Sequence, residues 1–320
     1  MGFKVLIPQY VPESSIQRLH ELGCTIDTGC GATEADLIAA IGDADAVIAR
    51  TAPYTAAVIK AAKKLKIIAR YGVGVDNIDL EAAAQAGIWV SNTPFSNLGS
   101  VAEHTVGLLL ALAKNFRVAD RELRAGNFNI RSSLTGIDLA GKTIGLIGMG
   151  RIGSMVAKKC ALGLDMHVLA YDPYLTPDKV PQGVELSADW DHVFSTADVI
   201  SMHLPLNDST RGIVSTREFS MMKKTAFFIN CARGDVVDEA ALVQALRSGE
   251  IAAAGLDVYA HEDPGKKNPL FELENTLLTP HTASFTHEAY HRLGVDAVSC
   301  VENVLFKGEP PVWPVNHPVF

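Results

Sequence analysis

The chain has 320 residues, 48% of them hydrophobic and 20% charged, which is the composition of a globular protein long enough for two domains. Its formal net charge of −8 argues against nucleic acid or an anionic membrane surface as a partner. The five cysteines are scattered and form no C-x-x-C pair, no apolar run has the length of a membrane span, and no signal peptide is evident, so we expect a cytoplasmic protein with reduced thiols.

The first 97 residues alternate between strand-like apolar runs and helical patterns. The predicted strands are residues 3–7, 46–49, 66–69 and 88–90. The predicted helices are residues 12–22, 34–41, 55–65 and 80–86. This alternation predicts a parallel sheet covered by helices, and therefore a complete α/β unit.

A long apolar helix is predicted over residues 100–116, and a polar stretch with weak periodicity follows at residues 123–141. Two interpretations stay open. The helix and the polar stretch could bridge domains or subunits, or they could be a core helix and a surface loop.

The α/β alternation resumes at residue 143, where a glycine-rich turn follows a short apolar strand. This strand covers residues 143–147, and Gly148, Gly150 and Gly153 then form G-x-G-x-x-G at the start of a helix over residues 151–162. The motif binds a dinucleotide in this strand-to-helix context. The first glycine permits the tight turn, the second leaves room for a pyrophosphate, and the third lets the helix approach the strand.

An acidic residue follows the motif at the distance that is typical of dinucleotide-binding folds. A second strand, residues 166–171, ends in Asp172, nineteen residues after Gly153. A carboxylate at this place accepts hydrogen bonds from a ribose 2′-OH and repels a 2′-phosphate, which predicts NAD as the cofactor. The alternative is a glycine-rich turn with an incidental aspartate.

The remaining pattern continues the same alternation. Further strands are predicted at residues 198–202, 225–230, 252–256 and 276–278. Further helices are predicted at residues 189–196, 216–222 and 239–248, with a final long helix at residues 288–306. The pattern predicts a doubly wound, Rossmann-type parallel sheet.

Polar residues stand where these strands end, and ligands of open α/β sheets bind beyond the carboxyl ends of strands. Residues 71–77 carry two glycines whose N–H groups could bind a carboxylate, although a plain tight turn explains them equally well. Later strands are followed by His203, Arg233, Asp257 with Glu262, and His281.

The chemistry of these side chains fits proton transfer. Arg233 has a fork of donors that suits a carboxylate together with a carbonyl. His281 could give or take a proton, and Glu262 or Asp257 could orient its ring.

Several motifs resemble those of the D-isomer-specific 2-hydroxyacid dehydrogenases, in order and spacing, over nearly the whole chain. They are Arg50, Gly72–Asp79, Asn92–Pro94, Ala102–Glu103, the G-x-G-x-x-G turn with Asp172, Asn230–Gly234 with Asp238, Gly255–Tyr259 with Glu262–Pro264, and Pro280–Thr286. The resemblance implies an oxidoreductase that transfers a hydride between NAD(H) and a small D-2-hydroxy acid or 2-oxo acid. It also implies that Arg233, Glu262 and His281 are the catalytic residues.

The resemblance further implies an architecture. A smaller, flavodoxin-like substrate domain begins with residues 1–97. The NAD-binding Rossmann domain, residues 98–287, is inserted into it, and residues 288–320 return to it. Homodimers built through the arm at residues 100–140 are usual in the family.

Binding residues are implied in the same way. Asp172 would bind the adenosine ribose, Asp257 would lie near the nicotinamide carboxamide, and the 72–75 loop would hold the substrate carboxylate. The implied cofactor-binding residues are Gly148, Gly150, Arg151, Ile152, Gly153, Asp172, His203, Pro205, Thr210, Cys231, Ala232 and Asp257. The implied substrate-binding residues are Arg50, Arg70, Gly72, Val73, Gly74, Arg233 and His281, and no metal site is expected.

Two arginines bear on the substrate. Within the family, Arg50 and Arg70 are similar to arginines that the 3-phosphoglycerate dehydrogenases use for the substrate phosphate, and Arg131 on the arm could add a third cation. They could also be ordinary strand-end arginines, and glyoxylate or hydroxypyruvate would then be the expected substrate.

Two other classes of function stay in view. His287, Glu288 and His291 match H-E-x-x-H, which would place two imidazoles on one helix face as in a zinc hydrolase, but no third ligand stands out. The C-terminal-binding-protein corepressors resemble the same family and bind NAD while acting through protein contacts.

Overall fold

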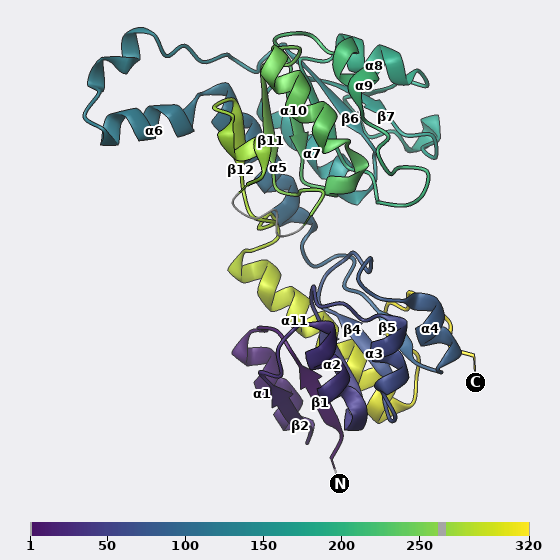
Figure 1. Cartoon of the computed structure of the whole chain (residues 1–320). Helices are drawn as coiled ribbons and strands as arrows, with labels where there is room; N and C mark the ends of the chain where they lie inside the picture. The colour runs from purple at the N-terminus through teal and green to yellow at the C-terminus, as the bar shows by residue number, and fades with distance from the viewer. Residues whose placement is uncertain (1, 262–266, 320) are drawn as a thin grey trace. The chain divides into compact units, whose positions relative to one another are not determined.

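A computed structural model describes residues 2–261 and 267–319 of the chain (Figure 1). The chain forms two compact units, Met1–Asn97 with Phe285–Phe320, and Leu98–Ser284. The second passage between the units falls three residues before the predicted position at 287/288. Phe285 belongs with the first unit because its ring packs on Tyr290, with ring centroids 5.3 Å apart.

The first unit is a parallel five-stranded sheet with the order β2-β1-β3-β4-β5. Its strands are β1 Lys4–Ile7, β2 Thr25–Thr28, β3 Ala46–Ala49, β4 Ile67–Arg70 and β5 Trp89–Ser91. Its helices are α1 Glu13–Glu21, α2 Glu34–Ala40, α3 Ala56–Ala61, α4 Leu80–Gln85 and α11 His287–Glu302. This strand order is that of the flavodoxin-like fold, as predicted.

Helix α11 completes this unit from the far end of the sequence. Its apolar face, with Leu293, Ala297 and Val301, shares a buried cluster with β1 and β4. A Cβ on Gly294 would lie 2.1 Å from Ser15 Oγ, so α11 packs closely on α1 at this glycine. The C-terminal segment is also fixed to this unit, because Val315 N donates to Val90 O at 2.8 Å and the Asn316 side chain bonds the backbone of β5.

The second unit is a parallel seven-stranded sheet with the order β12-β11-β10-β9-β6-β7-β8. Its strands are β6 Thr143–Ile147, β7 His167–Tyr171, β8 Val184–Leu186, β9 Val199–Met202, β10 Phe227–Asn230, β11 Ala253–Leu256 and β12 Thr276–Leu278. Its helices are α5 Leu98–Ala113, α6 Phe116–Arg124, α7 Arg151–Gly163, α8 Trp190–Thr196, α9 Thr216–Met221 and α10 Glu239–Ser248. Read from β8, the order is the doubly wound Rossmann order with one strand added at the end, so the predicted Rossmann fold is confirmed.

Two buried clusters cover the two faces of this sheet. Helices α5 and α7 contribute to one cluster and α8, α9 and α10 to the other. Short helical turns complete the molecule at Ile41–Asp43, Phe128–Ser132, Pro177–Lys179, Gly234–Val236, Pro269–Glu272 and, as a π-helical turn, Asn303–Lys307. No helix among the described residues combines the length and the apolar character needed to cross a bilayer.

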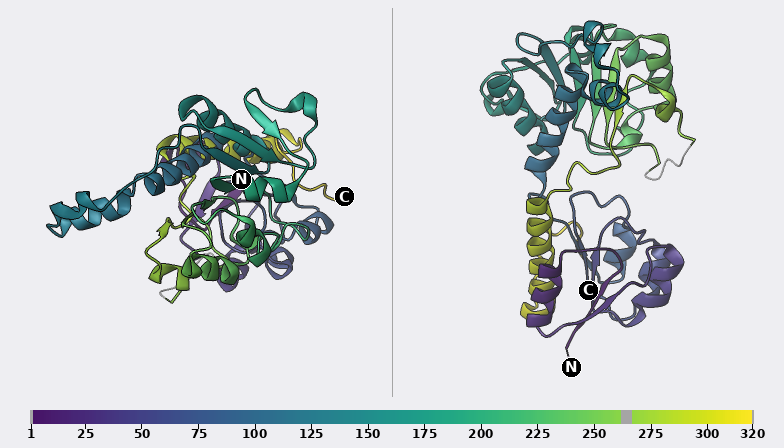
Figure 2. Two further views of the ribbon diagram at one scale, coloured as in Figure 1. Left: turned by 90° about the horizontal axis from the view of Figure 1, so that it is seen from above. Right: turned by 90° about the vertical axis from the view of Figure 1, so that its left-hand side faces the viewer.

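The polar stretch after α5 differs from the prediction. The helix predicted to run to residue 116 ends at Ala113, because Asn115 takes left-handed backbone angles (φ 53°) and a separate helix, α6, starts at Phe116. Helix α6 has no buried residue and projects from the second unit as an arm (Figures 1 and 2). The base of the arm is held by ion pairs from Arg117 and Arg121 to Glu274.

Two strands were missed and several helix ends were misplaced. Strands β2 and β8 lie at sheet edges and have no fully buried residue, so they lack the apolar run that predicts a strand. Helix α3 stops at Ala61 rather than residue 65. The α-helical part of α11 ends at Glu302, and a π-helical turn continues it to Lys307, one residue beyond the predicted end at 306.

Candidate active site

The glycine-rich turn joins β6 to α7 and shows which glycines the fold itself requires. Gly148 has φ +98°, and a Cβ there would lie 2.9 Å from His203 O. A Cβ on Gly153 would lie 2.2 Å from Gly148 O. Gly150 is the N-cap of α7, yet a Cβ there would meet no atom within 4 Å. The open space at Gly150 therefore lies at the positive end of a helix, where an anion binds well.

Asp172 lies directly beside this turn. Met149 N donates to one carboxylate oxygen of Asp172 at 2.8 Å, and Tyr174 N donates to the other at 2.9 Å. Two backbone donors therefore fix the carboxylate at the end of β7, the position that favours a ribose 2′-OH over a 2′-phosphate.

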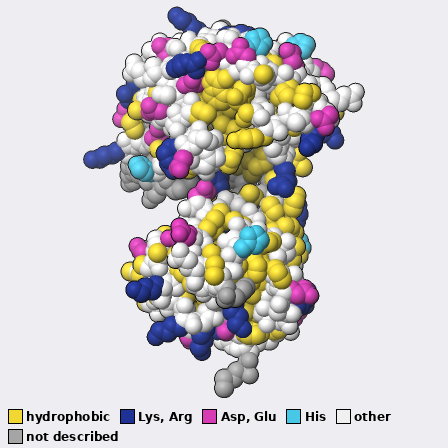
Figure 3. Space-filling model, turned by 90° about the vertical axis from the view of Figure 1, so that its right-hand side faces the viewer, with side chains coloured by type: hydrophobic (Ala, Val, Ile, Leu, Met, Phe, Trp, Pro, Cys, Tyr) yellow, Lys and Arg dark blue, Asp and Glu magenta, His cyan; other side chains and the backbone are white. Residues whose placement is uncertain are grey.

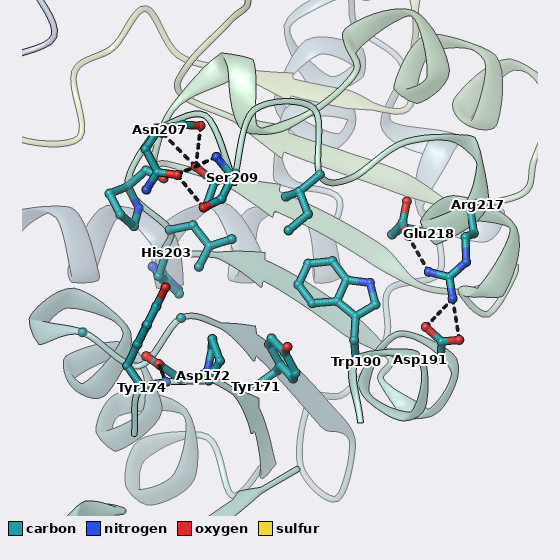
Figure 4. Close-up of a pocket in the computed structure, with 17 residues that line it drawn as sticks. Tyr171, Asp172, Tyr174, Trp190, Asp191, His203, Asn207, Ser209, Arg217 and Glu218 are labelled. Atoms are coloured by element: carbon teal, nitrogen blue, oxygen red, sulfur yellow. Dashed lines mark hydrogen bonds and ion pairs between the residues drawn. The ribbon is translucent and has the colours of Figure 1, made fainter. Parts of the chain in front are cut away.

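A cavity of about 570 Å³ opens between the turn and Asp172 on one side and the segment after β9 on the other (Figure 4). It is lined by Gly148, Gly150, Tyr171, Asp172, Pro173, Tyr174, Trp190, Asp191, His203, Leu204, Pro205, Asn207, Ser209, Thr210, Ile213, Arg217 and Glu218. At the far end Arg217 pairs with Asp191 and Glu218, beside the Trp190 ring. Hydrophobic side chains gather on one face of the second unit (Figure 3). The aromatic and aliphatic side chains of this lining suit a planar base, and its polar side chains suit a sugar.

His203 stands at the wall of this cavity and is neutral at neutral pH. Burial lowers the pKa of its imidazole to about 4. Its Nε2 lies 3.0 Å from Ser201 Oγ, and its backbone N–H donates to Ile147 O at 2.8 Å. Along the same wall the Thr210 hydroxyl donates to Pro205 O at 2.7 Å, which closes the loop that lines the cavity.

The carboxyl ends of three neighbouring strands carry the candidate catalytic groups. Asn230, Leu256 and Leu278 are paired in register at the ends of β10, β11 and β12. Asp257 N donates to Asn230 O at 3.0 Å, and His281 N donates to Asp257 O at 2.8 Å. The loops that carry Arg233, Asp257 and His281 therefore share one sheet edge, as the sequence predicted from strand ends. Glu262 lies outside the described residues.

Arg233 sits in a turn held by Asn230. The Asn230 side chain accepts from Ala232 N at 3.0 Å and donates to Arg233 O at 2.8 Å. A Cβ on Gly234 would lie 1.8 Å from Tyr259 O, so only glycine lets this loop touch the loop after β11. Neighbouring Cys231 is buried, which raises the pKa of its thiol to about 12 and excludes a thiolate at neutral pH.

Asp257 is unusual in the burial of its side chain, and His281 is unusual in its backbone angles. The Asp257 side chain is fully buried and accepts hydrogen bonds from Thr282 N and Ala283 N, both at 2.8 Å. His281 has φ +53°, left-handed angles that are uncommon outside glycine. Such backbone strain persists only where the surroundings hold it, and it gathers at functional sites.

The 71–74 loop lies in the first unit. Gly72 has φ +147°, and its N–H is already used by Arg70 O and Thr93 Oγ1, both at 2.9 Å. The Arg70 guanidinium braces the loop by donating to Gly74 O at 2.9 Å and to Tyr71 O. Among the described residues, the N–H groups of Val73 and Gly74 have no acceptor. Two backbone donors of the predicted anion loop therefore remain open.

Arg50 also has local partners. Its guanidinium carbon lies 5.5–5.7 Å from the ring centroids of Tyr71, Phe285 and Tyr290. Its Nη1 donates to Tyr10 O at 3.0 Å. Cation–π contacts and this hydrogen bond give Arg50 a structural role in the first unit. On the arm, Arg131 stacks over the Phe128 ring at 4.7 Å.

The H-E-x-x-H segment forms the first turn of α11. His287, Glu288 and His291 are exposed there. Among residues 2–261 and 267–319, no group of three or more His, Cys, Asp or Glu side chains is placed to hold a metal.

Sequence reasoning missed part of the cavity. Pro173 and Tyr174 directly follow a strand end, so the rule that found Asp172 could have found them. Trp190 reaches the cavity from α8, Arg217 from α9, and Ile213 from the loop between β9 and α9. No sequence motif marks these three, because only the packing of these helices on the sheet brings them there.

The doubly wound sheet, the open glycine turn and the fixed Asp172 define a dinucleotide-binding α/β protein. Residues 106–283, more than half of the chain, match the NAD binding domain of the D-isomer specific 2-hydroxyacid dehydrogenases. The chain belongs to this family and carries its NAD-binding domain.

Known proteins resemble the chain over most of its length. It is 42% identical to D-3-phosphoglycerate dehydrogenase of Archaeoglobus fulgidus, over 98% of this chain and 59% of that protein. The chain spans little more than half the length of the curated relatives it matches. The crystal structure of TT0316 protein from Thermus thermophilus has a TM-score of 0.91 and 36% identity, covering 98% of this chain and all of that one. D-Lactate dehydrogenase from Aquifex aeolicus, complexed with NAD and lactic acid, has a TM-score of 0.87 and 28% identity, covering 98% of this chain and all of that one.

Proposed function

We propose that the chain transfers a hydride between NAD(H) and a small D-2-hydroxy acid or its 2-oxo acid. One observation carries the proposal: the second unit joins an open dinucleotide turn to a sheet edge that presents Arg233, Asp257 and His281. The family of the chain supports the same reaction.

The residues of the second unit fit NAD. The space at Gly150 and the first N–H groups of α7 would hold the pyrophosphate, and Asp172 would bind the adenosine ribose. His203, Pro205 and Thr210 would line the adenosine side, and Asp257 would lie near the carboxamide. Bound NADH would supply the hydride.

The protein side chains have separate tasks in the reduction direction. Arg233 donates to the 2-oxo oxygen and stabilises the charge that develops on it. His281 donates a proton to that oxygen and takes it back in oxidation. Glu262 is assigned to orient the His281 ring. The open N–H groups of Val73 and Gly74 are assigned to the substrate carboxylate.

We assign 3-phosphoglycerate as the first candidate substrate, because curated relatives at 42–44% identity carry the name D-3-phosphoglycerate dehydrogenase. The second candidate is glyoxylate or hydroxypyruvate. It is favoured by the contacts of Arg50 and Arg70, since both guanidinium groups already serve the first unit.

NADH absorbance with a panel of 2-oxo acids tests the reaction: 3-phosphohydroxypyruvate, hydroxypyruvate, glyoxylate and pyruvate. Arg70→Ala should raise KM for the phosphorylated substrate at least tenfold more than for glyoxylate if Arg70 binds a phosphate, since each charge-assisted bond contributes about 1.5–3 kcal/mol. Arg18→Ala, an exposed arginine on α1, is the matched control. An equal rise in KM for all substrates would mean that Arg70 is structural, and glyoxylate or hydroxypyruvate would remain as the candidate substrate. A protein that binds NADH without turnover on any acid would favour the corepressor-like alternative.

A homodimer through the arm is part of the proposal. Phe116, Leu123 and Phe128 on the arm are 58–60% exposed, which is apolar surface that a partner subunit would cover. Leu123→Glu should yield a monomer in light scattering, while Leu162→Glu, at another exposed site on α7, should not. A monomeric parent protein would end this part of the proposal.

A cytoplasmic location rests on the thiols. All five cysteines are free, and free buried thiols are typical of a reducing compartment. Fractionation of cells that make the protein, followed by immunoblotting, tests the location.

A further inference from the structure

His104 lies on the first helix of the second unit, beside the sheet edge that carries the candidate catalytic groups. Helix α5 packs closely on β11, because a Cβ on Gly255 would lie 3.2 Å from Leu108 Cβ and 3.3 Å from Leu112 Cδ1. His104 is one turn before Leu108 on the same helix face. Its ring therefore points to the carboxyl ends of β11 and β12.

The ring makes two contacts there. His104 Nε2 lies 3.0 Å from Thr279 Oγ1 and 3.6 Å from Asp257 Oδ1. The Thr279 hydroxyl lies 2.5 Å from Asp257 Oδ1. The His104 side chain is 23% exposed, and that of Asp257 is fully buried.

The direction of the hydrogen bonds follows from proton counting. Thr279 has one hydroxyl proton, which it donates to its shortest acceptor, Asp257 Oδ1. The Thr279 oxygen must therefore accept from His104, which places a proton on Nε2. The chain of donation runs from His104 through Thr279 to Asp257.

Asp257 connects this chain of hydrogen bonds to His281. Its side chain accepts from the N–H groups of Thr282 and Ala283, and its backbone carbonyl accepts from His281 N. The strained φ belongs to His281. His281 and the two residues after it are therefore all hydrogen-bonded to Asp257, and His281 N also bonds Thr279 O. A buried carboxylate holds such a loop firmly only while its donors are complete.

We infer that His104 is a positioning residue of the active site: through Thr279 and Asp257 it holds the backbone from which His281 projects. The effect on turnover rests on the proposed function, whereas the effect on the loop does not. Removing the His104 donor takes away the hydrogen bond that the Thr279 oxygen accepts and loosens the 281–283 loop. The chemistry of the reaction is unchanged; only its geometry is altered.

Two measurements on the whole chain test this inference. His104→Leu removes the donor and keeps most of the volume; it should raise hydrogen exchange at the Thr282 and Ala283 amides and lower kcat by roughly tenfold, the upper range for one hydrogen bond. KM for the 2-oxo acid should stay nearly constant, because an interaction needed only in the transition state is lost. His104→Gln, which restores an N–H donor, should recover kcat to within about twofold of the parent.

Controls separate positioning from packing. Val106→Ala loosens the same helix away from the network and should change neither measurement. Thr279→Val should behave like His104→Leu, and the double variant should be no worse than the worse single variant, because both act through one chain of bonds. If His104→Leu does not fold, Thr279→Val and His104→Gln still carry the test.

The outcomes are distinct. In an active parent enzyme, an unchanged kcat or unchanged exchange in His104→Leu would overturn the inference. If the parent shows no turnover on any 2-oxo acid, the proposed function fails, and the exchange rates of His104→Leu against Val106→Ala decide the inference alone.

Discussion

A substitution at Gly150 can change cofactor binding without changing stability, because the fold does not require a glycine there. It is the N-cap of α7 with φ −65° and ψ −166°, extended angles that alanine also adopts. A Cβ there would meet no protein atom within 4 Å. Gly150→Ala should therefore lower the free energy of unfolding by at most about 1 kcal/mol, the preference of an N-cap for glycine over alanine.

Cofactor affinity should respond much more strongly than stability. A methyl group at Gly150 would stand where the pyrophosphate must approach the N–H groups of α7. Losing one charge-assisted hydrogen bond of about 1.5–3 kcal/mol corresponds to a rise in the Kd for NADH of at least tenfold. Titration followed by NADH fluorescence gives the Kd, and urea unfolding gives the stability.

Two other glycines of α7 provide the controls. Gly163→Ala, at the far end of α7 with open space around it, should change neither Kd nor stability by a large factor. Gly153→Ala puts a Cβ 2.2 Å from Gly148 O, and this overpacking should cost about 1–3 kcal/mol of stability. If Gly150→Ala bound NADH as tightly as the parent protein, the assignment of the pyrophosphate to this space would be wrong.

Three further expectations concern Asp172, the catalytic pair and His203. Asp172→Ala should narrow the preference for NADH over NADPH, measured as the ratio of kcat/KM values, and an unmodified protein with equal kcat/KM for both cofactors would contradict the role of Asp172. His281→Ala and Arg233→Ala should each lower kcat strongly, with about 10²–10⁴-fold expected for loss of general acid catalysis, whereas a near-normal His281→Ala would reassign the proton donor. The pKa of His203 is lowered to about 4 from an ordinary 6.5, so between these pH values the unfolded chain binds more protons than the folded one. The free energy of unfolding should therefore fall as the pH drops from 6.5 to 4, and His203→Gln should make that fall smaller, measured as urea midpoints.

Much of the architecture was readable in the sequence alone. The alternation of apolar runs and helical patterns predicted parallel sheets, because strands buried on both faces must be apolar throughout. Gly148, Gly150 and Gly153 marked the dinucleotide turn, because the fold requires a glycine at Gly148 and Gly153 and the missing side chain of Gly150 leaves room for a pyrophosphate. Strand ends located Arg233, Asp257 and His281, because parallel strands place their carboxyl ends at one edge.

Other features depended on tertiary structure. Strands β2 and β8 form at sheet edges, where pairing with a neighbour replaces an apolar run. The break at Asn115 and the arm beyond it arise from one left-handed residue whose angles no local pattern announces. The contacts that brace the 71–74 loop and surround Arg50 come from residues as distant as Tyr290, so the sequence left their role open.

The network at His104 shows where sequence reasoning ends. The helical spacing of residues 100–116 predicted that His104 lies along an apolar helix, but it named no partner for the ring. Only packing of α5 on β11 brings its Nε2 within reach of Thr279, which is 175 residues away. Sequence determined which groups stand at the sheet edge, because strand ends are a local property; the fold decided which of them bond to one another, because a hydrogen bond depends on distances set by the whole core.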